Sequence, residues 1–224
     1  MKIHVITYAT HSEGMFKELI NNKFNIKVKV LGWRTKWNGF MDKFKTMYEY
    51  IQTLPKNDII IFIDGFDSKI NQPIDIIKKN FLEFDSDIVI SLHPNLLGNY
   101  LNKKIFGTCK GNLIANSGLY MGYNIKIQEL LNNILNNNYS RDDQTSLNSA
   151  CKYFSNIKLD INKKLFNNLN YLDRYINNKS EACFISKPGD LTLNRLKRVP
   201  EEYIPFIWKE LLFIILIIII MYYI

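Results

Sequence analysis

The stretch DIIIFIDGFDS, residues 58–68, sets the fold class of this 224-residue chain. Its first part, Asp58–Ile63, is a continuous apolar run of the kind that forms a strand buried on both faces of a parallel sheet. Two carboxylates, Asp64 and Asp67, follow where that strand ends. Ligands of open α/β sheets bind beyond the carboxyl ends of the strands, so the stretch predicts both a sheet and a site at its edge.

Strand and helix patterns alternate on either side of this stretch, which predicts an α/β domain with a mostly parallel sheet. A second apolar strand is expected at Asp87–Leu92, and Ser12 is a plausible N-cap for the first helix. Further strands are expected at residues 3–8 and 26–31, and helical spacing is found over 13–22, 40–54, 125–137 and 143–153.

Composition excludes wholesale disorder and leaves room for one sizeable domain, because 47% of the residues are hydrophobic. The net charge of +8 attracts phosphates, acidic membranes or nucleic acid without choosing among them. The aromatic residues are scattered rather than gathered on a basic strand, so the pattern does not favour nucleic-acid binding.

The cysteines, at 109, 151 and 183, are odd in number and widely spaced. We therefore expect neither a zinc site nor a disulfide framework, and a reducing compartment is the default. No signal peptide is expected, because Met1 and Lys2 run straight into the first strand. These features predict that the main domain lies in the cytosol.

The tail Leu211–Ile224 carries no charge. As a helix it would be about 21 Å long, shorter than a bilayer core of about 30 Å. Extension back to Ile204 makes it long enough but includes Lys209 and Glu210. A buried core helix is the alternative, yet apolar residues on every side favour a membrane anchor. The expected organisation is a domain over 1–199, a linker over 200–205 and a hydrophobic helix over 206–224.

Two carboxylates after a buried strand can hold a hard divalent cation, Mn²⁺ or Mg²⁺, which completes its shell with water and substrate phosphates. Asp64 and Asp67 are the candidates, although Asp and Gly are also common in turns that end strands.

Three other features carry weaker signals, each with a structural alternative. Asp142-Asp143-Gln144 could contribute carboxylates to a site, or Asp142 could only cap a helix. Asn116-Ser117-Gly118 could admit a substrate or form a plain turn. Lys43 could meet a phosphate, but a lone lysine is usually solvated.

The order and spacing of these segments resemble the glycosyltransferase domain of procollagen lysyl hydroxylases and related collagen-modifying glycosyltransferases, giant-virus members included. The similarity covers roughly residues 3–198. The segments that carry it are VITYAT (5–10), SEG (12–14), LGW (31–33), Lys43, DGFD (64–67), NSGLYMG (116–122), DDQ (142–144) and LFNNLN (165–170).

This resemblance implies a GT-A-like nucleotide-sugar-binding domain, a UDP-sugar donor, a Mn²⁺ or Mg²⁺ ion, and an acceptor hydroxyl such as hydroxylysine or galactosyl-hydroxylysine in a collagen-like protein. It also implies roles for residues. Asp64 and Asp67 match metal ligands; Thr7, Tyr8, Thr10 and Phe66 match the uridine-binding part; Lys43 matches a basic residue facing the donor; Asn116, Ser117 and Gly118 match a sugar-binding segment; Asp142, Asp143 and Gln144 match the segment facing sugar and acceptor.

The chain departs from the family pattern at two places. Ser186 stands where the family has a third metal ligand, a His, and Asp190 is a candidate substitute. The Gly-rich run before Lys43 is reduced to residues 38–42. The resemblance leads us to expect a metal-dependent glycosyltransferase. The two departures leave a non-catalytic, membrane-tethered UDP- or glycan-binding relative as the alternative. A structural membrane protein whose important part is the tail is a second rival. A nucleotidyltransferase is a third and weaker one, because it would share a two-carboxylate metal site but would not explain the 116–118 and 142–144 segments.

Overall fold

The structure is a computed structural model that describes all residues except 95–98, 170–179, 188–207, 209–211, 214 and 222–224. The chain divides into two units, Met1–Pro188 and Gly189–Ile224, and the first holds every strand of the described residues. The expected linker at 200–205 and the candidate ligand Asp190 lie outside the described residues.

The first unit is built around a six-stranded sheet of order β2-β1-β3-β6-β5-β7. Only β6 runs against its two neighbours, and the other pairs are parallel, so the predicted mostly parallel α/β sheet is confirmed. The architecture is consistent with a GT-A-like domain. The strands are β1 (Ile3–Tyr8), β2 (Val28–Leu31), β3 (Ile59–Ile63), β5 (Ile88–Leu92), β6 (Ala115–Tyr123) and β7 (Ile157–Asp160).

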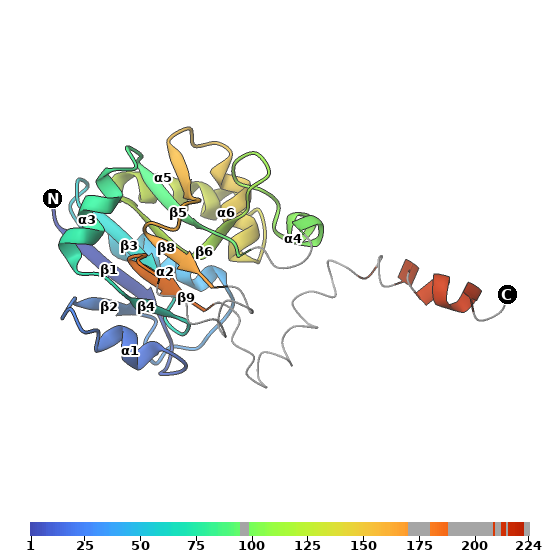
Figure 1. Cartoon of the computed structure of the whole chain (residues 1–224), viewed down its shortest axis with the longest axis horizontal. Helices are drawn as coiled ribbons and strands as arrows, with labels where there is room; N and C mark the ends of the chain where they lie inside the picture. Colours follow the sequence, from blue (N-terminus) through green and yellow to red (C-terminus); the bar gives the residue numbers. More distant parts are fainter. Residues whose placement is uncertain (95–98, 170–179, 188–207, 209–211, 214, 222–224) are drawn as a thin grey trace. The chain divides into compact units, whose positions relative to one another are not determined.

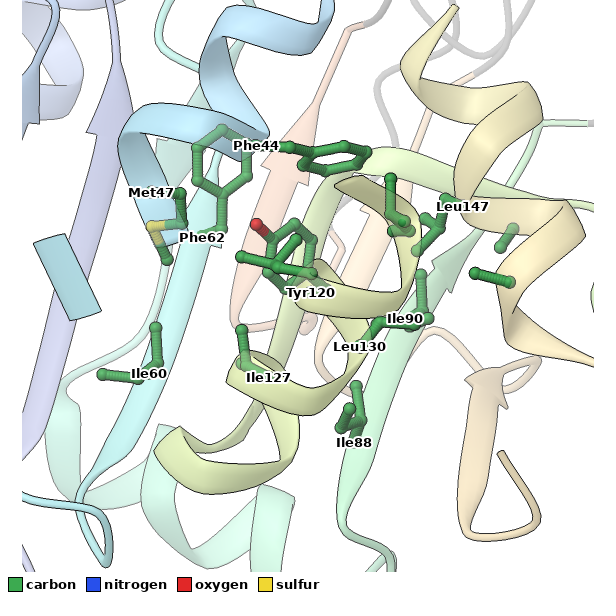
Figure 2. Close-up of a cluster of buried hydrophobic side chains, with 14 of the residues drawn as sticks. Phe44, Met47, Ile60, Phe62, Ile88, Ile90, Tyr120, Ile127, Leu130 and Leu147 are labelled. Atoms are coloured by element: carbon green, nitrogen blue, oxygen red, sulfur yellow. The ribbon is translucent and has the colours of Figure 1, made fainter. Parts of the chain in front are cut away.

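The apolar run of β3 divides between two cores, because successive side chains of a strand point to opposite faces. Ile60 and Phe62 face a core covered by three helices: α2 (Met41–Ile51), α5 (Asn124–Asn137) and α6 (Asp143–Cys151). Figure 2 shows that core, with Tyr120 stacked on Phe62 at 5.1 Å between ring centroids.

The other face of β3, formed by Ile59, Ile61 and Ile63, packs against α1 (Phe16–Ile20), α3 (Ile74–Leu82) and a small second sheet. Figure 1 shows these elements around the central strands, with α4 (Asn99–Phe106) at the side of the domain next to α6. A strand buried on both faces needs apolar residues at every position, which explains the unbroken run in the sequence.

The small sheet has the order β4-β9-β8, from β4 (Ser68–Ile70), β8 (Phe166–Asn168) and β9 (Phe184–Ser186). The antiparallel pairing of β4 with β9 sets Ser68 opposite Ser186, and β8 pairs with β9 in parallel. The segment after β3 is thereby joined to a segment more than a hundred residues further along the chain.

The first helix is shorter than expected, since α1 starts at Phe16 and its N-cap is Met15, without a side-chain cap. The expected cap at Ser12 is therefore wrong. Gly14 explains the difference: it has φ +53°, and a Cβ there would lie 2.2 Å from the Phe66 carbonyl oxygen. Met15 donates its N–H to the same oxygen at 2.8 Å, so residues before the helix are held as a loop against Phe66.

The expectation of no disulfide is also wrong, because Cys109 and Cys151 form one, with a Cα–Cα distance of 5.1 Å. They are 42 residues apart, and only the packing of the loop after α4 against the end of α6 brings them together. Cys183 is a buried thiol, and burial raises its pKa to about 11.

In the second unit, Trp208, Leu212, Phe213 and residues 215–221 are helical. Among the residues described, no helix is long and apolar enough to cross a membrane. The membrane anchor over 206–224 therefore stays a prediction, as does the cytosolic placement.

Asn124 should be important for stability, because its buried Nδ2, whose two protons can be shared, lies 3.0–3.1 Å from three backbone carbonyl oxygens, those of Ile51, Leu54 and Pro55. Asn124→Asp would turn a carboxylate oxygen toward these acceptors. We expect the free energy of unfolding, measured by urea denaturation, to fall by at least about 2 kcal/mol. Asn136→Asp on the exposed face of the same helix should change it by less than about 1 kcal/mol. Equal losses in both variants would contradict this role.

Candidate functional site

The reversed strand β6 brings two predicted segments together at the carboxyl edge of the sheet. Because β6 runs antiparallel to β3, its first residues lie beside the end of β3, with Leu119 opposite Ile63. The Asp64 N–H donates to the Gly118 carbonyl oxygen at 2.8 Å. A Cβ on Gly118 would lie 3.4 Å from Asp64 Cβ and 3.1 Å from Asn116 Oδ1, so glycine permits this close approach.

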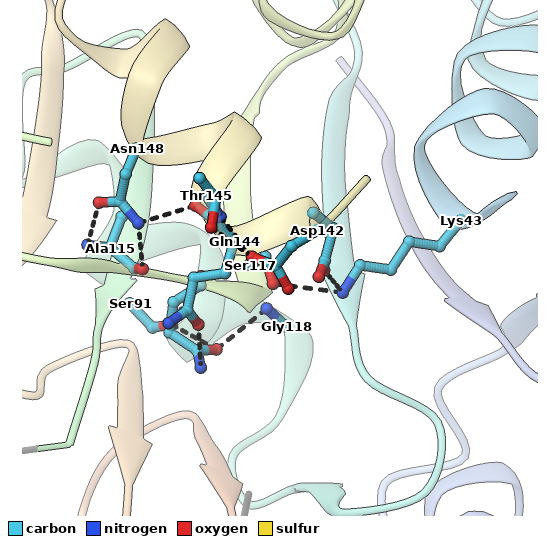
Figure 3. Close-up of polar contacts among 11 residues, drawn as sticks. Lys43, Ser91, Ala115, Ser117, Gly118, Asp142, Gln144, Thr145 and Asn148 are labelled. Atoms are coloured by element: carbon cyan, nitrogen blue, oxygen red, sulfur yellow. Dashed lines mark hydrogen bonds and ion pairs between the residues drawn. The ribbon is translucent and has the colours of Figure 1, made fainter. Parts of the chain in front are cut away.

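Lys43, at the start of α2, is buried and forms an ion pair with Asp143, at the start of α6. Its Nζ also donates to Ser117 Oγ at 3.3 Å (Figure 3). Burial acts to lower the pKa of Lys43, but the charges of Asp143, Asp64 and Asp142 outweigh it and raise that pKa. The solvated-lysine alternative is therefore wrong: Lys43 is a fixed cation among carboxylates.

Asp142 caps α6, as the helix-cap alternative predicted. Its Oδ1 accepts from the Thr145 N–H and from Thr145 Oγ1, both at 2.7 Å. Burial, followed by the neighbouring charge of Asp143, raises the pKa of Asp142. The site thus contains one carboxylate paired with a lysine and a second that holds its proton more readily than usual.

Asn148 fastens α6 to β6. Its Oδ1 accepts the Ala115 N–H at 2.8 Å, and its Nδ2 donates to the Ala115 carbonyl at 3.0 Å. This paired contact, fully buried, fixes the helix that carries residues 142–144 against the strand that carries residues 116–118. Asn116 Nδ2 then reaches Gln144 Oε1 at 3.3 Å.

Asp67 lies among hydroxyl groups. Ser68 Oγ and Ser186 Oγ donate to its Oδ1 at 3.0 and 3.1 Å, and the Lys187 N–H donates to its carbonyl oxygen at 2.8 Å. Ser186, which stands where a third metal ligand was expected, is thus in contact with the second metal-binding candidate. The pairing of β4 with β9 produces this contact.

The described residues contain no group of three or more His, Cys, Asp or Glu side chains that could hold a metal ion. The oxygen atoms that could bind a cation are instead the carboxylates of Asp64 and Asp67, in the loop after β3, and the hydroxyls of Ser68 in β4 and Ser186 in β9. An all-oxygen set with two carboxylates fits Mg²⁺ or Mn²⁺ when substrate phosphates and water complete the shell. These residues therefore suit a cation that is bound jointly by the protein and by the substrate phosphates.

The candidates for nucleotide contact lie at the end of β1 (Thr7 and Tyr8), on the loop after it (Thr10) and on the loop after β3 (Phe66). Thr7 is fully buried, and its Oγ1 has no hydrogen-bond partner within the described part of the chain. Tyr8 packs beside Trp37, with ring centroids 5.7 Å apart. Thr10 Oγ1 lies 2.9 Å from His11 Nδ1, and the His11 ring lies 5.1 Å from that of Phe66.

Sequence reasoning missed two residues of the site. Asn148 gives no motif signal, because its role depends on a helix docking onto a strand. His93 follows the carboxyl end of β5, and its Nδ1 lies 3.3 Å from Gln144 Nε2. The rule that located Asp64, a polar residue just beyond a buried strand, could have located His93 as well.

Comparison with known proteins defines the class of this domain. The family model described as the PLOD GT domain matches residues 1–185, so the chain belongs to that family and contains its glycosyltransferase domain. A multifunctional procollagen lysine hydroxylase and glycosyltransferase of Caenorhabditis elegans is 26% identical over 187 residues. The match covers 74% of this chain and 25% of the relative, so the chain spans about a quarter of the relative's length.

Removal of the Lys43 charge should destabilise the domain, because Asp143 would remain buried and unpaired. We expect Lys43→Met to lower the free energy of unfolding by about 3–5 kcal/mol in urea denaturation. The double variant Lys43→Met/Asp143→Asn should recover a large part of that loss. Lys45→Met, at an exposed position of the same helix, is the control. Additive losses in the double variant would show that the two side chains are not coupled.

Proposed function

We propose that this domain is a metal-dependent transferase that moves a hexose from a UDP-sugar to a hydroxyl acceptor. The observation that supports it best is the convergence of Lys43, Ser117 and Asp143 beside Asp64 at the carboxyl edge of the sheet. The family membership supports the same reaction class. Hydroxylysine or galactosyl-hydroxylysine of a collagen-like protein is the proposed acceptor, in line with the name of the nematode relative.

Each group in the site has a proposed role. A divalent cation held by Asp64 and Asp67 would neutralise charge on the departing diphosphate. The ion pair with Lys43 holds the Asp143 carboxylate in place, and its proposed role is to accept hydrogen bonds from sugar hydroxyls. The raised pKa of Asp142 suits a group that takes a proton from the acceptor hydroxyl, because a base works best when its pKa approaches the working pH.

A second candidate function is a non-catalytic relative that binds UDP or a glycan. Ser186 favours it, because a neutral hydroxyl beside Asp67 is a weaker metal ligand than an imidazole. Turnover separates the two candidates, because only the transferase releases UDP from a UDP-sugar in the presence of an acceptor.

Loss of the two carboxylates should abolish metal-dependent donor binding. In calorimetric titrations of the full chain with UDP, we expect binding with Mn²⁺ that is lost in EDTA and in Asp64→Ala/Asp67→Ala. Sugar transfer by that variant should fall about a hundredfold or more, because a cation contributes several kcal/mol to stabilisation of the transition state. The control is Asp75→Ala, at an exposed carboxylate of α3. Full transfer by the double variant would falsify the metal assignment.

An imidazole at position 186 should strengthen metal binding, because Ser186 Oγ already lies 3.1 Å from Asp67 Oδ1. We expect Ser186→His to raise the Mn²⁺ affinity, measured in the presence of UDP, by about tenfold, the scale of changes around metal ligands. Ser180→His, on the segment before β9, should leave it unchanged. Unaltered affinity in Ser186→His would mean that position 186 does not face the cation.

A further inference from the structure

A chain of side-chain amides links His93 to the start of β6, and its direction can be read from one fixed donor. The Gly118 N–H can only donate, and it lies 2.9 Å from a side-chain atom of Asn116. That atom must therefore be Oδ1, an acceptor. The Asn116 Nδ2 is left to donate, and it faces Gln144 Oε1 at 3.3 Å.

The same reasoning fixes the protonation of His93. Because Gln144 uses its oxygen to accept from Asn116, its Nε2 is the atom that faces His93, at 3.3 Å from Nδ1. An amide N–H₂ group has no lone pair to offer, so Nδ1 must be the acceptor. His93 then carries its single ring proton on Nε2.

The surroundings of His93 support this neutral form. Its backbone N–H donates to the Ile114 carbonyl at 2.9 Å, and its ring packs on Phe106 with centroids 5.4 Å apart. Burial lowers the pKa of His93 to about 4. The imidazole is therefore uncharged at neutral pH and is held by contacts that do not involve Nδ1.

The far end of the amide chain reaches the site. The carbonyl of Gly118 accepts the Asp64 N–H at 2.8 Å, so the residue fixed by Asn116 also holds the first residue of the loop after β3. Ser117, which lies between Asn116 and Gly118 in the sequence, accepts a hydrogen bond from Lys43 Nζ. Gln144 adjoins Asp143, the partner of Lys43. The orientation of the Asn116 and Gln144 amides thus bears on the position of Asp64 and on the surroundings of the Lys43–Asp143 pair.

We propose that His93 is a positioning residue for sugar transfer: its unprotonated Nδ1 orients the amides of Gln144 and Asn116 and, through Gly118, steadies Asp64. This inference rests on the proposed function for its kinetic part and on the hydrogen-bond geometry for its structural part. His93 touches none of the groups to which a chemical step is assigned, and it acts only through Gln144.

The structural part can be tested by the ¹⁵N chemical shifts of the histidine rings in the full chain. The sequence contains only His4, His11 and His93, so the ring signals can be assigned with single variants. We expect His93 to show the tautomer with Nε2–H at pH 7, and Gln144→Met to shift its Nδ1 resonance. His4, which pairs with Asp58 at 2.9 Å, should keep its shifts in that variant. A proton on Nδ1, or an Nδ1 signal unaffected by Gln144→Met, would overturn the inference.

The kinetic part is tested with two substitutions at the same position. His93→Leu removes the acceptor, and we expect kcat to fall about tenfold while KM for the UDP-sugar changes less than threefold. His93→Asn places an amide oxygen near the position of Nδ1, and it should recover most of the lost kcat. If kcat of His93→Asn is as low as that of His93→Leu, or if both variants change KM but not kcat, the positioning role is wrong.

A purely structural effect is excluded by a matched control. His4 is a half-buried histidine that is hydrogen-bonded to Asp58 and lies at the start of β1, away from the candidate site. His4→Leu should therefore alter thermal stability without lowering kcat. A wild-type chain that transfers no sugar would overturn the proposed function and the kinetic part together. The tautomer measurement would still decide whether the amide chain has the stated direction.

Discussion

The buried ion pair between Lys43 and Asp143 is the contact on which the arrangement of the site depends. It joins the first turns of α2 and α6 across the start of β6, and each partner would be costly to bury alone. Nearby carboxylates stabilise the lysine charge further, as the raised pKa of Lys43 reflects. An interaction of this kind restricts how the two helices can approach each other, and the amides of Asn116 and Asn148 complete the alignment.

The fold was largely predictable because its strands stand out in the sequence as short, continuous apolar runs. The runs Asp58–Ile63 and Asp87–Leu92 contain the apolar strands β3 and β5, and helical spacing marked α2, α5 and α6. The reversal of β6 was not predictable from periodicity, since the hydrophobic pattern of a strand carries no direction. That reversal matters, because a parallel β6 would place residues 116–118 at the other end of the sheet.

The site was predictable in its residue types more than in its contacts. Asp64 and Asn116 were selected as candidates from strand ends and motif order, and Asp142 proved to be a helix cap. The partner of Lys43 could not be found, because the two residues are a hundred positions apart and nothing local pairs them. The disulfide was missed for the same reason. Ser12 failed as a cap because a tertiary contact, Gly14 against Phe66, overrides the local preference.

The disulfide between Cys109 and Cys151 makes the anchoring of α6 depend on the redox state of the compartment in which the chain folds. Asp142 closes one end of α6 with hydrogen bonds, and Cys151 closes the other end with a covalent bond. A thiol pair of this kind stays open in a glutathione-rich cytosol and closes in an oxidising lumen. The helix that supplies Asp143 and Gln144 is therefore clamped at both ends in one environment and at a single end in the other.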